Sequence, residues 1–238
     1  MTNEIRISVI TVTFNAAQAL KMTIESVLAQ DYRNIEYIII DGASTDSSQQ
    51  IAEPYAKEGK LSWQSEPDKG IYDAMNKGVK KATGDYCIFM NAGDTFASPT
   101  VITQLISKGM DADVIYGDII KDGNIKRSLS PRNCHKMFYC HQSVFVRTAL
   151  LRAFPFDIKH RMSADFKQAK QLFLAKKTFK QTDVVVANFD TNGVSNTQRS
   201  RGLYDNMSIV WEVDNVYDKI RLLPRLFFTY IMCRLRGK

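Results

Sequence analysis

The octapeptide FMNAGDTF, residues 89–96, ends an apolar run with an asparagine, a glycine and an aspartate. Magnesium and manganese ions prefer oxygen ligands, and proteins hold them with one or two carboxylates together with substrate phosphates. Asp94 could supply the carboxylate and Asn91 a carbonyl oxygen, while Gly93 would leave room for a diphosphate. The pattern therefore predicts a site for Mn²⁺ or Mg²⁺ and a phosphorylated ligand.

Polar residues also follow other strand-like apolar runs, namely Thr13 and Asn15, Asp41, Glu66 and Asp68, and Asp118. In IIIDGASTD the small residues after Asp41 would let a ring or a ribose approach the backbone, although a helix cap and turn explain this segment equally well. In SEPDKGIYDAMNKG the charges around Gly70 also suit an ordinary solvated helix start.

The elements that must position these residues alternate along the first half of the chain. Strands are expected at residues 6–14, 35–41, 61–66, 85–91 and 113–118, and helices at 16–30, 46–59, 71–82 and from Ser98–Pro99 onward. Such alternation predicts a parallel sheet covered by helices on both faces. Ligands of these sheets bind at the carboxyl ends of the strands, where the polar residues lie.

The second half is less regular. KDGN (residues 121–124) predicts a tight hairpin, SADFKQAKQLFLAKK a helix from about Ser163, and TDVVVANFD a strand. A polar loop then leads to an amphipathic helix and a basic tail.

Composition limits the possible partners. The 238 residues carry a formal charge of +7, which suits an anionic partner, and four cysteines are too few for a disulfide framework. The first residues are expected to form a buried strand rather than an export signal, and no apolar run approaches the ~18 residues of a membrane span. A reducing cytosol fits this chain.

The sequence disfavours two other kinds of site, one for a dinucleotide and one for zinc. The first predicted turn, TFNAAQA, lacks the G-x-G-x-x-G phrase, so a dinucleotide-binding dehydrogenase is disfavoured. CHKMFYCH could suggest zinc, but its adjacent Cys-His pairs do not have the usual zinc-ligand spacing.

Four segments taken together, SVITVTFNA, IEYIIIDGASTD, SEPDKGIYDAMNKG and GDYCIFMNAGD, resemble the GT-A glycosyltransferases of family 2. They cover roughly residues 6–96, and EPDKGIYDAMNKG looks like the branch that builds bacterial exopolysaccharide and O-antigen in lipopolysaccharide, including colanic-acid-type transferases. The resemblance implies an α/β GT-A fold, with a Rossmann-like, mainly parallel central sheet flanked by helices. The expected GT-A domain is 1–200 (donor half about 1–118, acceptor half about 119–200), and residues 201–238 form amphipathic basic helices.

The resemblance also implies roles for individual residues. Asp94 would bind the metal, and the donor would contact Thr11, Thr13, Asn15, Asp41, Asp68, Lys69, Asn91, Ala92 and Gly93. Many relatives have D-x-D-D where this chain has NAGD, and arginine where it has Met75; Lys69 or Lys77 could compensate. Asp41 and Asp94 are expected to converge on one donor.

Downstream, Asp165 in HRMSADFKQA corresponds to the general base, which takes the proton of an acceptor hydroxyl as that hydroxyl attacks the donor sugar. A helix-start aspartate favoured by the helix dipole is the alternative. His141 and Gln142 would line the sugar or acceptor side. Ser195, Arg199 and Arg201 would meet the diphosphate, although a solvated basic loop explains them almost as well.

The resulting hypothesis is an inverting, metal-dependent glycosyltransferase that uses a nucleotide sugar, UDP in preference to GDP or dTDP. Its acceptor would be a polyprenyl-diphosphate-linked glycan in O-antigen or exopolysaccharide synthesis. The basic amphipathic tail predicts a peripheral position on the inner face of the cell membrane, or else packing on the body or in a homodimer. A nucleotidyltransferase acting on a sugar phosphate and a basic nucleic-acid-binding module are the alternatives. The first would normally have a glycine-rich phosphate loop, and no nucleic-acid-binding motif supports the second.

Overall fold

The computed structural model describes residues 4–190 and 199–236 of the chain. Within these residues the strands form one mixed sheet, in the order β3-β2-β1-β4-β8-β6-β9-β5, with β7 paired to β6. The strands are β1 (Ile7–Thr13), β2 (Ile35–Asp41), β3 (Ser62–Ser65), β4 (Tyr86–Phe89), β5 (Thr95–Phe96), β6 (Val114–Lys121), β7 (Asn124–Lys126), β8 (Val144–Arg147) and β9 (Phe179–Asn188).

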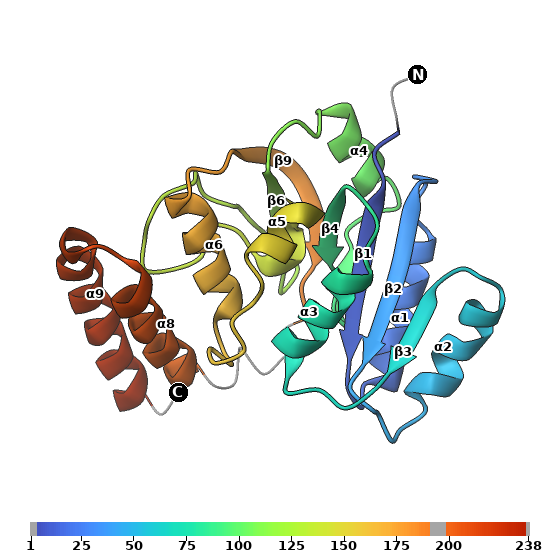
Figure 1. The fold of residues 1–238 in the computed structure, drawn as a ribbon, viewed down its shortest axis with the longest axis horizontal. Helices are drawn as coiled ribbons and strands as arrows, with labels where there is room; N and C mark the ends of the chain where they lie inside the picture. Colours follow the sequence, from blue (N-terminus) through green and yellow to red (C-terminus); the bar gives the residue numbers. More distant parts are fainter. Residues whose placement is uncertain (1–3, 191–198, 237–238) are drawn as a thin grey trace.

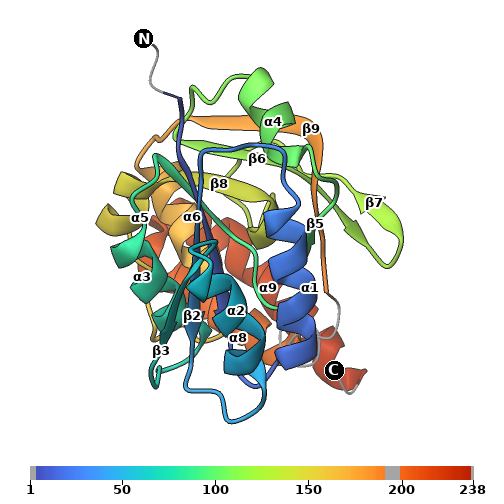
Figure 2. The same cartoon turned by 90° about the vertical axis from the view of Figure 1, so that its right-hand side faces the viewer.

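Helices cover both faces of this sheet, as Figures 1 and 2 show. They are α1 (Ala17–Leu28), α2 (Ser48–Lys57), α3 (Ile71–Lys81), α4 (Val101–Ser107), α5 (Thr148–Ala153), α6 (Ala164–Leu174), α8 (Arg199–Val213) and α9 (Val216–Leu235), with a 3₁₀ turn η1 at His141–Ser143. The α8–α9 pair lies at the end of the molecule opposite β3 and α2 (Figure 1).

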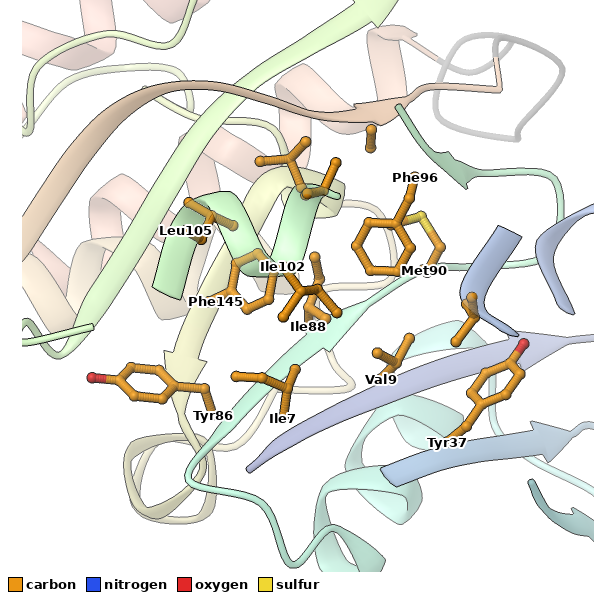
Figure 3. Close-up of a cluster of buried hydrophobic side chains, with 14 of the residues drawn as sticks. Ile7, Val9, Tyr37, Tyr86, Ile88, Met90, Phe96, Ile102, Leu105 and Phe145 are labelled. Atoms are coloured by element: carbon orange, nitrogen blue, oxygen red, sulfur yellow. The ribbon is translucent and has the colours of Figure 1, made fainter. Parts of the chain in front are cut away.

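The two faces follow from the period of two along each strand. In β1, Ile7 and Val9 point to a core built with α1, α2 and α4, whereas Ile10 and Val12 point to a core built with α3, α5 and α6. Figure 3 shows the first of these cores, where the ring of Phe145 lies among aliphatic side chains of the sheet and of α4. Burial on both faces explains the nearly continuous apolar runs of β1 and β2.

The predicted parallel sheet is confirmed for β1, β2, β3 and β4, which pair in parallel, and it becomes mixed beyond β4. β8 pairs antiparallel with β4 and β6, and β5 pairs antiparallel with β9. The KDGN hairpin is confirmed, since Asp122 and Gly123 both have positive φ (51° and 73°), as this turn requires.

One local expectation needs correction. Helix α4 begins at Val101 with Thr100 before it, so Ser98 and Pro99 precede the helix. The strands β5 and β8 were not predicted, because two and four residues carry too little pattern to detect. Helix α8 begins at Arg199, close to the expected boundary after residue 200, and the division into domains stays a prediction.

The C-terminal pair α8–α9 has a small core of its own. Ile209 and Val210 of α8 pack with Leu222 and Leu226 of α9 against Phe166 of α6. The C-terminal helices are therefore anchored to the helix that carries Asp165.

Candidate active site

A cleft of about 1050 Å³ lies at the carboxyl ends of β1 and β4. Its lining comes from residues within 12–16, 68–75, 91–94, 117–142, 158–165 and 189–190. The loop after β4, the start of α3 and the start of α6 meet here, because parallel strands bring the loops that follow them to one edge of the sheet.

Asp94 is the buried carboxylate of this cleft, with 4% of its surface exposed. Burial raises its pKa to about 6, and the neighbouring Asp190 adds to this effect, while hydrogen bonds from the Asp190 backbone and the Gln142 side chain oppose it. The Asp190 N–H donates to Asp94 Oδ1 at 2.9 Å. A buried carboxylate with few donors is suited to bind a cation.

Asp190 was not predicted as a site residue, yet it lies beside Asp94. The antiparallel pairing of β5 with β9 sets Thr95 opposite Asn188, so the residues just outside the ladder meet. Gly93 has φ +105°, and a Cβ there would lie 2.6 Å from Asp190 Oδ2. Glycine is required at that position both by its backbone angle and by this approach.

The residues around Asp94 fit a hard divalent cation. Within the described residues, Asn91 Oδ1 and Thr13 Oγ1 are buried without a hydrogen-bond partner, and both residues line the cleft. Carboxylate, amide and hydroxyl oxygens are the ligands that Mg²⁺ and Mn²⁺ prefer. Asp94 and Asp190 would hold such an ion, with Asn91 as a further oxygen donor.

Asp165 lines the same cleft at the first turn of α6. The Tyr72 hydroxyl donates to Asp165 Oδ1 at 2.8 Å, and the Phe166 N–H donates to the same oxygen at 2.9 Å. Burial, together with the charge of Asp165, raises the pKa of Tyr72 well above its ordinary value, so the hydroxyl keeps its proton. Among the described hydrogen bonds both donors use Oδ1, which leaves Oδ2 available to accept a proton.

His141 and Gln142 also line the cleft, in the 3₁₀ turn before β8. The His141 ring stacks on Phe89, with centroids 5.1 Å apart, and burial lowers the pKa of His141. A neutral imidazole is therefore expected at neutral pH. The Gln142 side chain forms a hydrogen bond with Asp94, so it lies beside the candidate metal ligand, and its role on the sugar or acceptor side stays a prediction.

Asp41 lies at the same sheet edge, but its carboxylate is directed into the protein. It is 1% exposed and does not line the cleft. It accepts hydrogen bonds from the Ser44 N–H (3.0 Å), the Ser44 hydroxyl and the Ser65 hydroxyl (2.6 Å). Asp41 therefore braces the loops after β2 and β3, and its contact with the donor stays a prediction.

The space above Gly42 is filled by the protein itself. A Cβ at Gly42 would lie 2.6 Å from Asp68 Oδ2, so Asp68 occupies the position predicted for a ring or ribose. Asp68 Oδ1 accepts from the Gly70 N–H at 2.8 Å and fixes the start of α3. Asp68 and Lys69 both line the cleft, whereas Lys77 is bound to Glu66 at 2.9 Å and to the Pro67 carbonyl.

The remaining predicted donor residues divide between the cleft and the core. Thr13 and Ala92 line the cleft. Thr11 is fully buried within β1, where it donates to the Met90 carbonyl at 2.7 Å, and it does not line the cleft. Asn15, with φ 48°, joins two loops through Ser44 and Thr45 and does not line the cleft.

The predicted diphosphate loop is only partly described. Ser195 lies outside the described residues. Arg199 and Arg201 are exposed in the first turn of α8 and do not line the cleft, so their contact with a diphosphate stays a prediction.

The zinc alternative finds no support. Among the described residues, the histidine, cysteine and acidic side chains close enough to share an ion are Asp157, His160 and Glu212, not those of CHKMFYCH. The Lys167 ammonium already pairs with Asp157 (2.7 Å) and Glu212 (2.5 Å). His160 in turn bonds Asp205 and Glu212, so this cluster holds α8 to the loop before α6.

Solved structures share this architecture. Staphylococcus aureus TarS 1-349 in complex with UDP superimposes with a TM-score of 0.72 at 18% identity, over 93% of this chain and 70% of that one. The mannosyltransferase PcManGT from Pyrobaculum calidifontis, in complex with GDP-Man and Mn²⁺, gives 0.68 at 18% identity, over 89% and 64%. The fold is the GT-A fold of glycosyltransferases.

Sequence comparison narrows the class. The family described as Glycosyl transferase family 2 matches residues 8–173. An uncharacterized glycosyltransferase of Mycobacterium tuberculosis, Rv1514c, is 31% identical over 234 residues, 91% of this chain and 87% of that protein. A PGL/p-HBAD biosynthesis glycosyltransferase of Mycobacterium bovis is 30% identical over 207 residues, 80% and 79% of the two chains. The chain belongs to glycosyl transferase family 2 and is a glycosyltransferase.

Proposed function

We propose that this enzyme transfers a sugar from a nucleotide sugar, UDP in preference to GDP or dTDP, to a hydroxyl group with inversion at the sugar carbon. The observation that carries the proposal is that Asp94 and Asp165 line one cleft, the first beside Asp190 and the second in the first turn of α6. A cation site and a base facing one cavity are what this reaction needs.

The donor diphosphate is anchored at Asp94, Asp190 and Asn91. A divalent ion bound there would neutralise the charge of the leaving nucleoside diphosphate. The carboxylates bind the ion only when ionised, so Asp94, with its raised pKa, links donor binding to pH.

Asp165 acts on the acceptor. As the acceptor oxygen bonds to the sugar carbon and the bond to the diphosphate breaks, Asp165 takes the hydroxyl proton. Tyr72 and the Phe166 N–H hold Oδ1 and so fix the direction of the carboxylate. Neutral His141 and Gln142 contribute polar groups to the wall without adding charge.

We further propose that the acceptor is a polyprenyl-diphosphate-linked glycan and that α9 lies on the inner face of the membrane. No helix in the described part of the chain is long and apolar enough to cross a membrane. However, α9 is apolar on two sides. Leu222, Leu226 and Cys233 are buried, while the outward stripe is exposed, formed by Tyr217, Ile220, Phe227, Phe228, Ile231 and Leu235.

Charge favours a lipid surface over a second copy of α9. Arg221, Arg225, Arg234 and Arg236 flank the stripe, and Asp218 is the acidic residue of the helix. Two copies packed stripe to stripe would bring these arginines together, whereas anionic headgroups would neutralise them at about 1 kcal/mol each.

The transfer proposal is tested with purified protein, Mn²⁺ and a set of UDP-, GDP- and dTDP-sugars, with polyprenyl-diphosphate-linked glycans as acceptors. Release of the nucleoside diphosphate together with a glycosylated lipid is expected. Release of pyrophosphate would indicate a nucleotidyltransferase, and no turnover of any donor would refute the proposal.

The membrane proposal is tested by sedimentation with vesicles of phosphatidylglycerol and phosphatidylcholine. The double variant Phe227→Ser/Phe228→Ser should lose most of its vesicle binding, and the exposed pair Met22→Ser/Ile125→Ser, which lies outside α9, serves as the matched control. Equal binding of both variants, or loss of a dimer instead of vesicle binding, would contradict it.

A further inference from the structure

The charged residues that line the cleft differ in sign between two parts of the chain, which we call the donor wall (residues 12–94 and 189–190) and the acceptor wall (residues 117–165). The donor wall contributes the carboxylates of Asp68, Asp73, Asp94 and Asp190 against one lysine, Lys69. The acceptor wall contributes one carboxylate, Asp165, against the four cations Lys126, Arg127, Lys136 and Arg161. The two walls therefore carry opposite charge.

Three of these cations lack a carboxylate partner. Arg127 pairs with buried Asp118 at 2.8 Å, so its charge is already compensated. Across residues 4–190 and 199–236, no ion pair involves Lys126, Lys136 or Arg161. Cations gathered in one concave surface repel one another, and an anionic ligand relieves that repulsion.

The three come from separate parts of the fold. Lys126 ends β7, Lys136 lies in the loop between β7 and η1, and Arg161 precedes α6 by three residues. No single helix or loop contains all three residues. The tertiary fold brings them to the wall that also carries Asp165.

The positive charge continues from the cleft toward α9. Burial lowers the pKa of His135, and the nearby charges of Lys136, Arg225 and Arg132 lower it further. The Arg221 guanidinium donates to the Asn133 carbonyl at 2.9 Å, which ties α9 to the same loop. The cationic wall is thus continuous with the basic helix proposed to lie on the membrane.

We propose that Lys126, Lys136 and Arg161 bind a phosphate group of the acceptor. The inference rests on the proposed transferase function and adds the residues and the ligand chemistry of its acceptor site. Arginine binds phosphate through two parallel N–H groups, and lysine binds it as a point charge. The donor diphosphate would bind at the donor wall, where Asp94 and Asp190 would hold a metal ion.

The test measures binding to the full chain by calorimetry. UDP is present at a saturating concentration, so that the donor wall is occupied, and Mn²⁺ is kept no higher than the protein concentration. The probes are geranyl diphosphate, inorganic pyrophosphate and geraniol. The variant is Lys126→Gln/Lys136→Gln/Arg161→Gln. The matched control, Lys80→Gln/Lys81→Gln/Lys159→Gln, removes the same charge from exposed residues outside the cleft.

The site variant should bind geranyl diphosphate about tenfold more weakly or worse, and the control should stay within about twofold of the wild type. Geraniol should bind weakly to all three proteins. Tighter binding of geranyl diphosphate than of pyrophosphate would identify a lipid-linked source, and equal binding a free phosphate group; both support the phosphate site.

Unchanged affinity in the site variant, or an equal loss in the control, would overturn the inference. A loss of UDP affinity in the site variant, with geranyl diphosphate binding retained, would assign the cations to the donor and also overturn it. The thermal midpoint reports folding, and Arg161→Lys alone should keep most of the affinity. Failure of the wild type to turn over any UDP-, GDP- or dTDP-sugar would refute the proposed function separately, because this binding assay needs no turnover.

Discussion

The donor wall and the acceptor wall of the cleft carry charges of opposite sign. The donor wall carries carboxylates, and its key residue, Asp94, is buried with a pKa raised to about 6. The acceptor wall carries four cations and one partly exposed carboxylate, Asp165. A wall of carboxylates can hold a diphosphate only through a metal ion, whereas a wall of cations holds an anion directly. Metal removal should therefore weaken donor binding and leave acceptor binding intact.

A second contrast lies within the donor side. Asp41 and Asp94 are both nearly fully buried after strands that neighbour β1. Asp41 receives three hydrogen bonds from two serines. Asp94 lies beside another carboxylate and keeps a raised pKa. Burial alone thus does not distinguish a bracing carboxylate from a candidate metal ligand; the two carboxylates differ in the hydrogen-bond donors and charges around them.

The largest effect is expected at the acceptor wall. Asp165→Asn removes the proton acceptor, so transfer should fall by about 10²- to 10⁴-fold. UDP affinity in Mn²⁺ should remain within about twofold, because Asp165 lies on the other wall. Single-turnover transfer and calorimetry measure the two quantities. Tyr72→Phe, which only frees Oδ1, should cause a smaller loss of transfer; lost UDP binding in Asp165→Asn would show that its role is wrong.

The next largest effect concerns the dependence of UDP affinity on Mn²⁺, which is expected at the donor wall alone. Asp94→Ala should reduce the affinity for UDP in Mn²⁺ about tenfold or more, to the value measured with a chelator, because the ion loses its buried carboxylate. Calorimetry with Mn²⁺ and with chelator checks this. Asp190→Asn should give a partial loss. If Asp94→Ala kept the full Mn²⁺ enhancement, the ion would bind elsewhere.

Asp41 provides the contrast within the donor side. Asp41→Asn replaces an oxygen that accepts from serine hydroxyls by an amide, and should lower the free energy of unfolding by about 2 kcal/mol. Urea unfolding measures this change. The ratio of UDP affinities with and without Mn²⁺ should not change. A loss of that ratio would place Asp41 at the metal instead.

The smallest effect concerns Asp94 and pH. Its folded pKa lies above the ordinary value of 3.8, so the folded state binds the proton more tightly and stability falls as pH rises from about 4 to about 6. Above that window Asp94→Asn should raise the free energy of unfolding of the metal-free protein by about 1–2 kcal/mol. At pH 3 the gain should vanish. Mn²⁺-dependent UDP binding of the wild type should weaken as pH falls through about 6.

Much of the fold could be predicted from local pattern. The β1–β4 half was predicted because strands buried on both faces read as long apolar runs between amphipathic helices. In the mixed half β6, β9, α6 and the hairpin of β6 with β7 were predicted, but β5 and β8 were not, since they are short and their pairing depends on residues distant in the chain.

The candidate site was predicted to a similar degree. Asp94 and Asp165 were found because each follows a recognisable phrase, and both line the cleft. Asp190 was missed although it ends the predicted strand TDVVVANFD, because a single aspartate at a strand end carries no motif and its meeting with Asp94 depends on the pairing of β5 with β9. The cations of the acceptor wall carry no motif.

By itself, then, the sequence determined the strand–helix alternation and the polar residues at strand ends, because both are set by neighbours a few positions apart. Only the tertiary structure decided that Asp190 meets Asp94, that Thr11 points into the core and that Asp41 is saturated by serines. It also decided that Lys126, Lys136 and Arg161 line one wall. The physical reason is that side-chain direction and pairing register are fixed by packing between segments, which no single segment encodes.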